Sequence, residues 1–207
     1  MTPLLTPESS PLDHQFAFIV EIDKLKSILR QNSLVDRSRR ENSAEHSWHV
    51  ALMALVLAEH AETPVNTGRV IELLLVHDLV EIDAGDTFAY DTKGAETQHQ
   101  REMVAAERIF GLLPAEQATR LRARWDEFAT SETPEARFAL AVDRLMPMVH
   151  NALTEGSAWQ ANRVVADQVR RRAESITRGA PSLGALANRL IDASVAAGHL
   201  PDPVRKP

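Results

Sequence analysis

The 207-residue sequence contains no cysteine. Disulfide bonds, zinc sites with thiolate ligands and a cysteine nucleophile are therefore excluded. The lack of cysteine also fits a reducing compartment. Positive charge is scarce too, because 23 Lys and Arg residues stand against 29 Asp and Glu residues and give a formal net charge of −6. We therefore expect no nucleic-acid polymer as a partner, and an anionic substrate needs a local basic cluster.

Long apolar segments are also missing from the sequence. Residues 1–15 have neither a basic flank nor an apolar stretch, so we do not expect a secretory signal there. The longest apolar run, Ile71–Ile82, is far too short to span a bilayer and is interrupted by His77 and Asp78. The sequence favours a cytoplasmic protein that has no membrane as a partner.

The pattern of apolar residues predicts an all-α fold. No stretch shows the sustained alternation of a strand, whereas apolar residues recur at helical spacings of three and four. The 44% hydrophobic and 25% charged residues are typical of a globular chain, and the length suits one domain. We predict a single helical bundle of about seven to nine helices over residues 13–200, with a flexible arm at 1–12 and a frayed tail at 201–207. Helices are expected at about 12–28, 43–61, 70–82, 97–110, 116–128, 134–149, 162–176 and 182–197, with a kink at Pro147.

The helix expected at 70–82 carries the most informative residues. His77 and Asp78 lie side by side among apolar residues, where an ionised carboxylate is costly unless it is paired or bound to a metal. Glu81 lies one turn further on the same side, and Asp86 follows a glycine at the end of the helix. A polar stripe that faces solvent is the alternative. The apolar flanks on both sides favour a functional site.

Two more candidate ligands lie far from this helix in the sequence. His46 is in the first turn of the helix expected after its cap, Ser43, and Asp143 is a single acid in an apolar helical run. The alternative for Asp143 is a buried ion pair with Arg144 or another arginine. His49 shares a face with His46, but for His49 we favour a surface, capping or supporting role.

Together, His46, His77, Asp78 and Asp143 would offer nitrogen and oxygen atoms to one divalent metal ion. Such a set suits Mn, Co, Fe, Zn or Mg better than a thiophilic ion. With four protein ligands, coordination positions stay open for water and substrate. A metalloprotease is disfavoured because the sequence has no HExxH motif, and the corresponding span reads HDLVE.

Basic residues for an anionic substrate lie in two polar segments. Arg37, Arg39 and Arg40 precede the first histidine and have the planar fork that suits phosphate oxygens. Lys93 lies in the longest polar connection of the chain and could also reach the site. A solvated loop is the alternative for at least one of these arginines. The run Arg170–Glu174 is expected to be a solvated helix face.

The order His46, His77-Asp78, Asp143 resembles the signature of the HD-domain phosphohydrolases. The segments ENSAEHS (Glu41–Ser47), HDLVE (His77–Glu81) and Gly85-Asp86 are similar to those of the 5′-deoxynucleotidase branch, and the resemblance extends from about Asp23 to Asn151. It implies an all-α HD domain, usually a homodimer, with one divalent metal bound by His46, His77, Asp78 and Asp143. It also implies that Glu81 and Asp86 assist the chemistry as catalytic residues.

That branch carries an Arg-Trp pair upstream of the first histidine, where this chain has Arg30 but no tryptophan nearby. Phosphate binding is therefore expected from Arg30, Arg37 or Arg40. The function expected is metal-dependent hydrolysis of a phosphomonoester, in particular a (deoxy)nucleoside 5′-monophosphate. The alternatives are hydrolysis of a cyclic nucleotide, a pyrophosphate or a triphosphate, and a metal-binding regulatory module without turnover.

Overall fold

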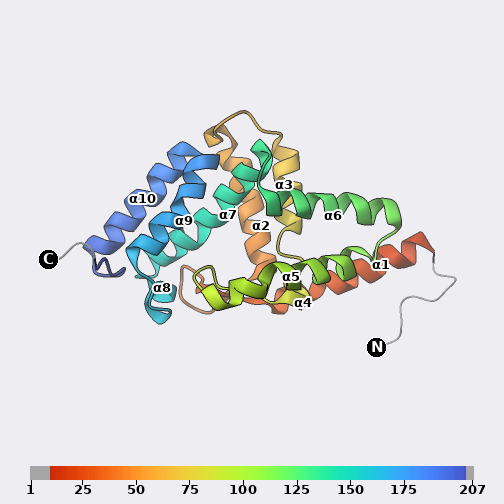
Figure 1. Cartoon of the computed structure of the whole chain (residues 1–207), viewed down its shortest axis with the longest axis horizontal. Coiled ribbons are helices and arrows are strands. Elements are labelled where there is room, and N and C mark those ends of the chain that lie inside the picture. The colour runs from red at the N-terminus through yellow and green to blue at the C-terminus, as the bar shows by residue number, and fades with distance from the viewer. Residues whose placement is uncertain (1–9, 204–207) are drawn as a thin grey trace.

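Helices make up most of the structure, a computed structural model that describes residues 10–203 (Figure 1). Eight helices have ten residues or more: α1 (Pro11–Ile22), α2 (Ser43–Leu57), α3 (Thr67–Val76), α5 (Thr92–Phe110), α6 (Ala115–Thr130), α7 (Pro134–Leu153), α9 (Ala166–Gly179) and α10 (Pro181–Ala196). Four are shorter: η1 (Asp23–Ser27), η2 (Ala58–His60), α4 (Glu81–Ala84) and α8 (Ser157–Ala161). The predicted all-α fold is confirmed.

The sequence does not predict the small antiparallel sheet that the structure contains. Strand β1 (Leu29–Ser33) pairs with β2 (Arg40–Asn42), and the hairpin turns near Arg37, whose φ is 61°. Both strands are short and mostly polar, so they lack the alternation that marks a half-buried strand. The hairpin places Arg30 beside Glu41, just before α2.

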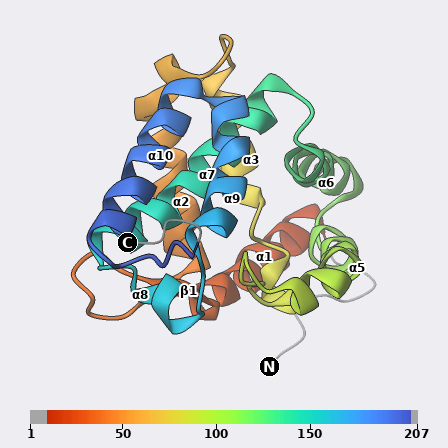
Figure 2. The ribbon, with the colours of Figure 1, turned by 60° about the vertical axis from the view of Figure 1, so that its left-hand side comes forward.

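The helices form two groups, each with its own core (Figure 2). In the larger group, α7 packs against α2, α3, α9 and α10. Its buried side chains include Val50, Leu74, Phe138, Val142, Trp159, Ile176 and Ile191. In the smaller group, α1, α5, α6 and the segment after α3 enclose Phe18, Val80, Ile109, Phe110 and Trp125. Since α3 contributes to one core and the segment after it to the other, the chain that leaves α3 lies where the two groups meet.

The helix expected at 70–82 is interrupted in the structure. α3 ends at Val76, and residues 77–80 form a turn before α4. The backbone bonds there span three residues rather than four, as in the bond from Leu79 N–H to Val76 O at 3.2 Å. Apolar periodicity does not reveal this change, because Leu79 and Val80 are buried in the turn as they would be in a helix.

Both predicted ends of the domain differ from the structure. Residues 11 and 12, expected in the flexible arm, belong to α1, which Ser10 caps. Two residues of the expected frayed tail bond to α9, because Pro201 O accepts from Ala166 N–H at 2.8 Å and Arg170 donates to Asp202 at 3.0 Å. The other parts of these two segments, residues 1–9 and 204–207, lie outside the described residues.

Pro147 lies inside α7, and the helix continues past it to Leu153. The Pro147 carbonyl accepts hydrogen bonds from the side chains of Asn32 at 3.1 Å and Asn151 at 3.0 Å, so α7 is tied to β1 at this point. Among the described residues, no helix is long and apolar enough to cross a membrane.

Candidate metal centre

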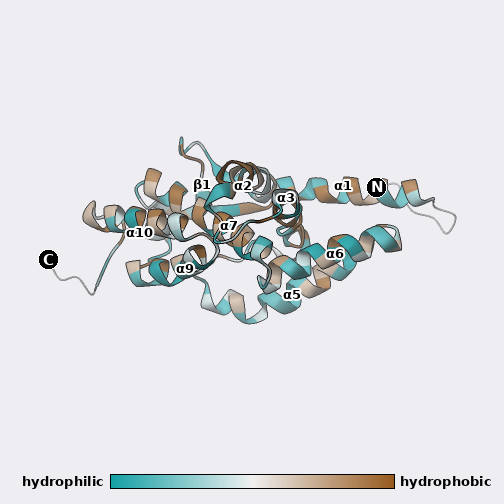
Figure 3. Cartoon of the chain, turned by 90° about the horizontal axis from the view of Figure 1, so that it is seen from above, coloured by the Kyte–Doolittle hydropathy of each residue, from teal (hydrophilic) through white to brown (hydrophobic). Residues whose placement is uncertain are grey.

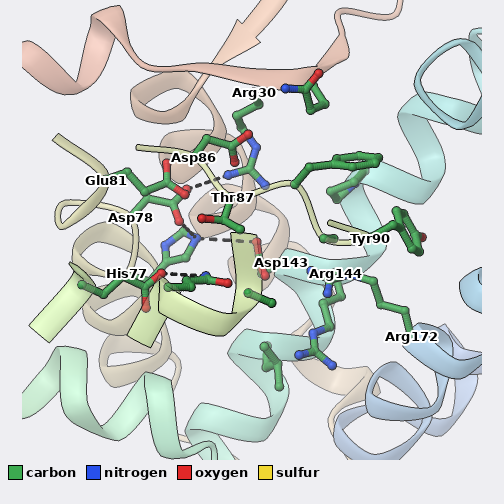
Figure 4. A pocket seen from close by; sticks show the side chains of 18 of the residues that line it. Arg30, His77, Asp78, Glu81, Asp86, Thr87, Tyr90, Asp143, Arg144 and Arg172 are labelled. Atoms are coloured by element: carbon green, nitrogen blue, oxygen red, sulfur yellow. Dashed lines mark hydrogen bonds and ion pairs between the residues drawn. The ribbon is translucent and has the colours of Figure 1, made fainter. Parts of the chain in front are cut away.

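The four predicted metal ligands lie where the two groups of helices join, and Figure 4 shows three of them, His77, Asp78 and Asp143. His46 lies in α2, His77 and Asp78 follow α3, and Asp143 lies in α7. Asp143 Oδ1 is 3.0 Å from His46 Nε2 and 3.5 Å from His77 Nε2. Asp78 Oδ1 is 3.0 Å from the same nitrogen of His77. All four side chains are buried, so three distant parts of the sequence converge on one buried point.

The start of α2 explains the position of His46. Asn42 caps the helix: its Oδ1 accepts from Glu45 N–H at 3.0 Å, and its own N–H donates to Glu45 Oε1 at 2.7 Å. The sequence favours Ser43 as the cap, but Ser43 is the first helical residue, and its hydroxyl donates to Glu81 Oε2 at 2.6 Å. The reciprocal cap fixes the first turn, and His46 in that turn is fully buried.

The donor atoms of this cluster fit a divalent cation. His77 Nδ1–H donates to Leu74 O at 2.7 Å, so Nε2 is the ring nitrogen that faces the cluster and would bind a metal ion in place of a proton. That nitrogen is buried without a hydrogen-bond partner among the described residues, and it faces two carboxylate oxygens. Two ligand atoms at right angles on an ion at about 2.1 Å lie about 3.0 Å apart. The separations of 3.0 and 3.5 Å in the cluster agree with this geometry.

The carboxylates of the cluster also attract a positive charge to the site of the proposed metal ion. Burial alone lowers the pKa of His77, but the carboxylates of Asp78 and Asp143 raise it to about 9. Burial raises the pKa of Asp143, yet the neighbouring imidazoles of His46 and His77 reverse this and hold it well below its usual range. Asp143 therefore stays ionised at neutral pH, as a metal ligand must be.

Glu41 contacts His46 on the side of the ring that faces away from the cluster. Sequence reasoning missed this supporting role. Its buried Oε2 lies 3.3 Å from His46 Nδ1 and 3.8 Å from His150 Nδ1. A carboxylate on the outer nitrogen of a histidine ligand fixes the ring and makes the inner nitrogen a better donor. His49 lies in the same place, since ligand atoms of Glu41, His49 and His150 are all within 4.8 Å of one another. The one signal for Glu41 is its position at the head of the ENSAEHS segment.

The two predicted catalytic carboxyl groups lie beside the metal cluster (Figure 4). Burial and the nearby Asp78 raise the pKa of Glu81 well above its usual range. Burial also raises the pKa of Asp86, Asp78 adds to this, and Arg30 opposes it. Asp86 Oδ2 is buried and has no hydrogen-bond partner in the described structure. Carboxyl groups that titrate closer to neutral pH are suited to general acid–base chemistry.

Of the four predicted substrate-binding residues, the structure brings only Arg30 to the site. Arg30 Nη1 donates to Asp78 Oδ2 at 2.8 Å, and the residue lines the cavity described below. Arg37 is exposed and pairs with Glu155 at 2.9 Å. The exposed Arg40 donates to the backbone carbonyls of β1, and Lys93 is exposed in the first turn of α5. None of these three lines the cavity, contrary to the expectation. All three lie in solvated segments, and for the arginines a solvated loop was the alternative interpretation of the sequence.

A cavity of about 400 Å³ opens onto the metal cluster. Its wall also includes five aromatic side chains: Phe88, Tyr90, Trp125, Phe128 and Trp159. They come from the segment before α5, from α6 and from α8, so no local motif marks them in the sequence. Arg144 and Arg172 complete the wall. Arg144 Nη1 donates to Ser175 Oγ at 2.6 Å, whereas Asp143 contacts His46 and His77. The alternative of a buried Asp143–Arg144 ion pair is therefore not found in the structure.

A sequence model of the family described as HD domain matches residues 22–184. The chain belongs to the HD-domain family. The matched range includes His46, His77, Asp78 and Asp143, and the resemblance drawn from the sequence is confirmed. The HD-domain chain also resembles proteins of known name and structure.

The human relative named 5′-deoxynucleotidase HDDC2 is 30% identical over 128 residues, which are 61% of this chain and 61% of the relative. The match therefore spans less than two thirds of the human protein's length. A relative named 5′-deoxynucleotidase ECA3034, from Pectobacterium atrosepticum, is 31% identical over 131 residues, covering 59% of this chain and 65% of its own.

A solved structure is more similar to this chain. It is the crystal structure of a protein from Magnetospirillum magnetotacticum MS-1 described as a predicted metal-dependent phosphohydrolase. The two chains are 51% identical and superpose with a TM-score of 0.88, over 94% of this chain and 100% of the other. The arrangement of helices that forms the cavity is therefore shared with an experimentally determined structure.

Proposed function

We propose that this protein hydrolyses a phosphomonoester, a (deoxy)nucleoside 5′-monophosphate in particular, with one divalent metal ion held by His46, His77, Asp78 and Asp143. One observation carries the proposal: a buried two-histidine, two-aspartate cluster opens into the same cavity as Arg30, Glu81 and Asp86. The names of the human and bacterial relatives support the substrate class.

The ion supplies Lewis-acid chemistry at the phosphoryl group when it is bound, and Mn, Co, Fe, Zn or Mg would suit the ligand set. Arg30 binds a phosphate oxygen. Its side chain is 13% exposed, and its Nε is buried without a hydrogen-bond partner in the described structure. Asp78 and Glu81 outweigh the effect of burial and raise the pKa of Arg30, so the guanidinium stays charged.

Glu81 and Asp86 move the protons of the reaction. Hydrolysis requires that a proton leaves the attacking water and that one reaches the leaving oxygen. Both carboxyl groups line the cavity, and both have raised pKa values because of burial and the neighbouring Asp78. Ser43 holds Glu81 in place through its 2.6 Å hydrogen bond. The aromatic walls would enclose the nucleoside, and the 400 Å³ volume lies in the range of small-molecule sites.

Phosphate release from a panel of esters tests the proposal. The panel holds nucleoside and deoxynucleoside 5′-monophosphates, sugar phosphates, cyclic nucleotides, a pyrophosphate and triphosphates, each assayed with Mn²⁺, Co²⁺ and Mg²⁺. We expect release from the 5′-monophosphates and its loss in Asp78→Ala. The exposed Asp83, which pairs with Arg108, provides the matched control Asp83→Ala, which should keep activity. Turnover of the cyclic or polyphosphate compounds alone, or metal binding without turnover of any ester, would overturn the proposal.

We also propose a cytoplasmic homodimer. α2 exposes Trp48, Leu52, Leu55 and Val56, and α1 exposes Leu12, Phe16, Ile19 and Val20. In each helix these residues follow the spacing i, i+4, i+7, i+8, which places them on one face. The two helices lie along the same side of the molecule (Figure 3). Two apolar stripes on one side favour a protein–protein interface, and the cysteine-free composition suits a reducing compartment.

A further inference from the structure

Two arginines line the part of the cavity that the proposed reaction does not use. Arg144 follows Asp143 in α7, and Arg172 lies in α9, which packs against α7. Figure 4 shows both guanidinium groups on one side of the pocket with Tyr90, while Glu81 and Asp78 lie on the other side. The pocket therefore has an acidic end, where the metal cluster lies, and a basic end.

The run Arg170–Glu174 is not the uniform solvated face that the sequence suggests. Arg170 pairs with Asp192 at 2.9 Å, and Arg171 is exposed and pairs with Asp167. Arg172 is only partly exposed, and it lines the cavity instead. Helical geometry explains the difference, because adjacent residues in a helix point about 100° apart.

Neither Arg144 nor Arg172 forms an ion pair with a carboxylate of residues 10–203 within 4.0 Å. Arg144 Nη1 donates to the neutral Ser175, and Arg144 Nε is buried without a hydrogen-bond partner there. Both guanidinium groups lie on the same wall of the cavity, where their like charges repel each other. Asp143, which precedes Arg144 in the sequence, contacts His46 at 3.0 Å and His77 at 3.5 Å instead. Two unneutralised cations on a cavity wall are stabilised by a bound anion.

We propose that Arg144 and Arg172 form a second anion-binding site, and that it takes a second phosphate group of the substrate. The preferred substrate is then a phosphomonoester with another phosphate elsewhere on the same molecule, such as a nucleoside 3′,5′-bisphosphate. Because one cavity of about 400 Å³ joins the two ends, a single small molecule reaches both. The planar guanidinium fork matches phosphate oxygens and binds them more strongly than a neutral donor does.

The reaction itself is unchanged by the second site. Water adds its oxygen to the scissile phosphorus, the ester P–O bond breaks, and a proton reaches the leaving oxygen. The products are inorganic phosphate and an alcohol that still carries its second phosphate. A hollow of about 320 Å³ adjoins this end of the cavity, lined in part by Tyr90, Arg144 and Arg172. The choice of scissile phosphate rests on the proposed function. The binding of a second phosphate by Arg144 and Arg172 does not depend on it.

Two measurements test the site on the metal-loaded protein. The first compares kcat/KM for 2′-deoxyadenosine 3′,5′-bisphosphate and for 2′-deoxyadenosine 5′-monophosphate. We expect the wild type to prefer the bisphosphate by about tenfold, a typical value for one charge-assisted contact, and Arg172→Gln to lose the preference. The matched control is Arg189→Gln, an exposed arginine of α10 that lines neither the cavity nor the adjoining hollow and should leave the preference intact. Equal kcat/KM values for both esters in the wild type would overturn the inference.

The second measurement is independent of turnover. Calorimetry in a Glu81→Gln background compares binding of the bisphosphate with and without Arg172→Gln, and we expect about tenfold weaker binding when Arg172 is replaced. If this difference appears but no ester is hydrolysed by the wild type, the second site stands and the proposed function fails. If inorganic phosphate binds at Arg172 and speeds turnover of the monophosphate, the site takes a separate anion, and the substrate assignment is overturned.

Discussion

Asp143 Oδ1 lies 3.0 Å from His46 Nε2, although 97 positions separate the two residues in the chain. The contact joins α2 to α7 in the interior, and the same oxygen is 3.5 Å from His77 Nε2. One carboxylate oxygen therefore lies at the centre of the cluster. A metal ion bound there links three parts of the chain, so metal binding and folding stability are coupled.

Replacement of Asp143 by Asn should remove both metal and activity. Asn keeps the size of the side chain but loses the charge that a divalent ion requires. We expect bound metal by elemental analysis to fall from one ion per chain to near none, and phosphate release to fall by about a thousandfold or more. Added Mn²⁺ should stabilise the wild type by about 2.7 kcal/mol at a hundred times its Kd, and the variant hardly at all. The control is Asp126→Asn, at a half-exposed residue of α6 that pairs with Arg122 at 3.0 Å. Equal metal content in both variants would contradict the assignment.

Much of the site was predictable because its ligands have local signals. His77 and Asp78 are polar residues inside an apolar run, and Asp143 is a lone acid in another, which is costly without a partner. Glu41 lies in a short polar strand before α2 and has no apolar context, so its supporting role is apparent from its 3.3 Å distance to His46 rather than from burial in the sequence pattern. The aromatic wall residues come from separate elements, so their grouping follows from packing alone.

Helix positions were predictable from periodicity, but the interruption after Val76 was not. A helical turn with bonds that span three residues buries the same apolar residues as a regular α-helix, so the pattern of hydrophobicity is identical. The hydrophobic pattern does not predict the β1–β2 hairpin either. Its residues are mostly polar, and its pairing depends on backbone hydrogen bonds rather than on an apolar face. This hairpin also decides which arginine reaches the cavity, since Arg30 faces inward and Arg37 lies near its turn.

Arg30 and Arg37 should therefore behave differently when they are replaced. Arg30→Ala removes a charge-assisted phosphate contact that we expect to be worth about 2–3 kcal/mol, so kcat/KM should fall roughly 30- to 150-fold. Arg37→Ala removes an exposed ion pair with Glu155 and should change kcat/KM by less than about twofold. Steady-state kinetics on a 5′-monophosphate measures both. Equal losses in the two variants would place the phosphate outside the cavity.

A charge in the exposed stripe of α2 should separate a dimer. Leu52 lies between Trp48 and Leu55 in this stripe and is 45% exposed. In Leu52→Asp, burial of an unpaired carboxylate opposes association, so sedimentation at micromolar concentrations should find a monomer where the wild type is a dimer. Leu153→Asp is the matched control, because Leu153 is 55% exposed at the end of α7 and belongs to neither stripe. A monomeric wild type would refute the homodimer.

The Arg69–Glu127 pair should make stability depend on pH. Glu127 accepts hydrogen bonds from Arg69 Nε at 3.0 Å and from Thr133 Oγ1 at 2.7 Å. Burial raises the pKa of Glu127, but these partners lower it below its usual value overall. The stabilisation is therefore present above the unfolded pKa of about 4.3 and is lost as the pH falls through the lower folded pKa.

Glu127→Gln should accordingly lower the free energy of unfolding by about 1–2 kcal/mol at neutral pH. The difference from the wild type should shrink below about pH 4, where the wild-type carboxyl group becomes protonated. Urea unfolding at several pH values measures it, and Glu132→Gln, an exposed residue nearby, is the control. A difference that stays constant from neutral to acidic pH would contradict the pairing.

At Gly179 the backbone of α9 lies close against α7. A Cβ at this position would collide with the carbonyl of Arg137 and would lie 3.0 Å from Cβ of Ala141. Because the obstacle is backbone, Gly179→Ala forces the helices apart, and we expect it to lower the free energy of unfolding by about 2–3 kcal/mol. Gly68→Ala is the matched control, since a Cβ there meets only Asn66 Oδ1 at 3.3 Å and alanine favours a helix. Urea unfolding should show the loss for Gly179→Ala alone; equal stability of the two variants would mean that α7 and α9 do not touch at this glycine.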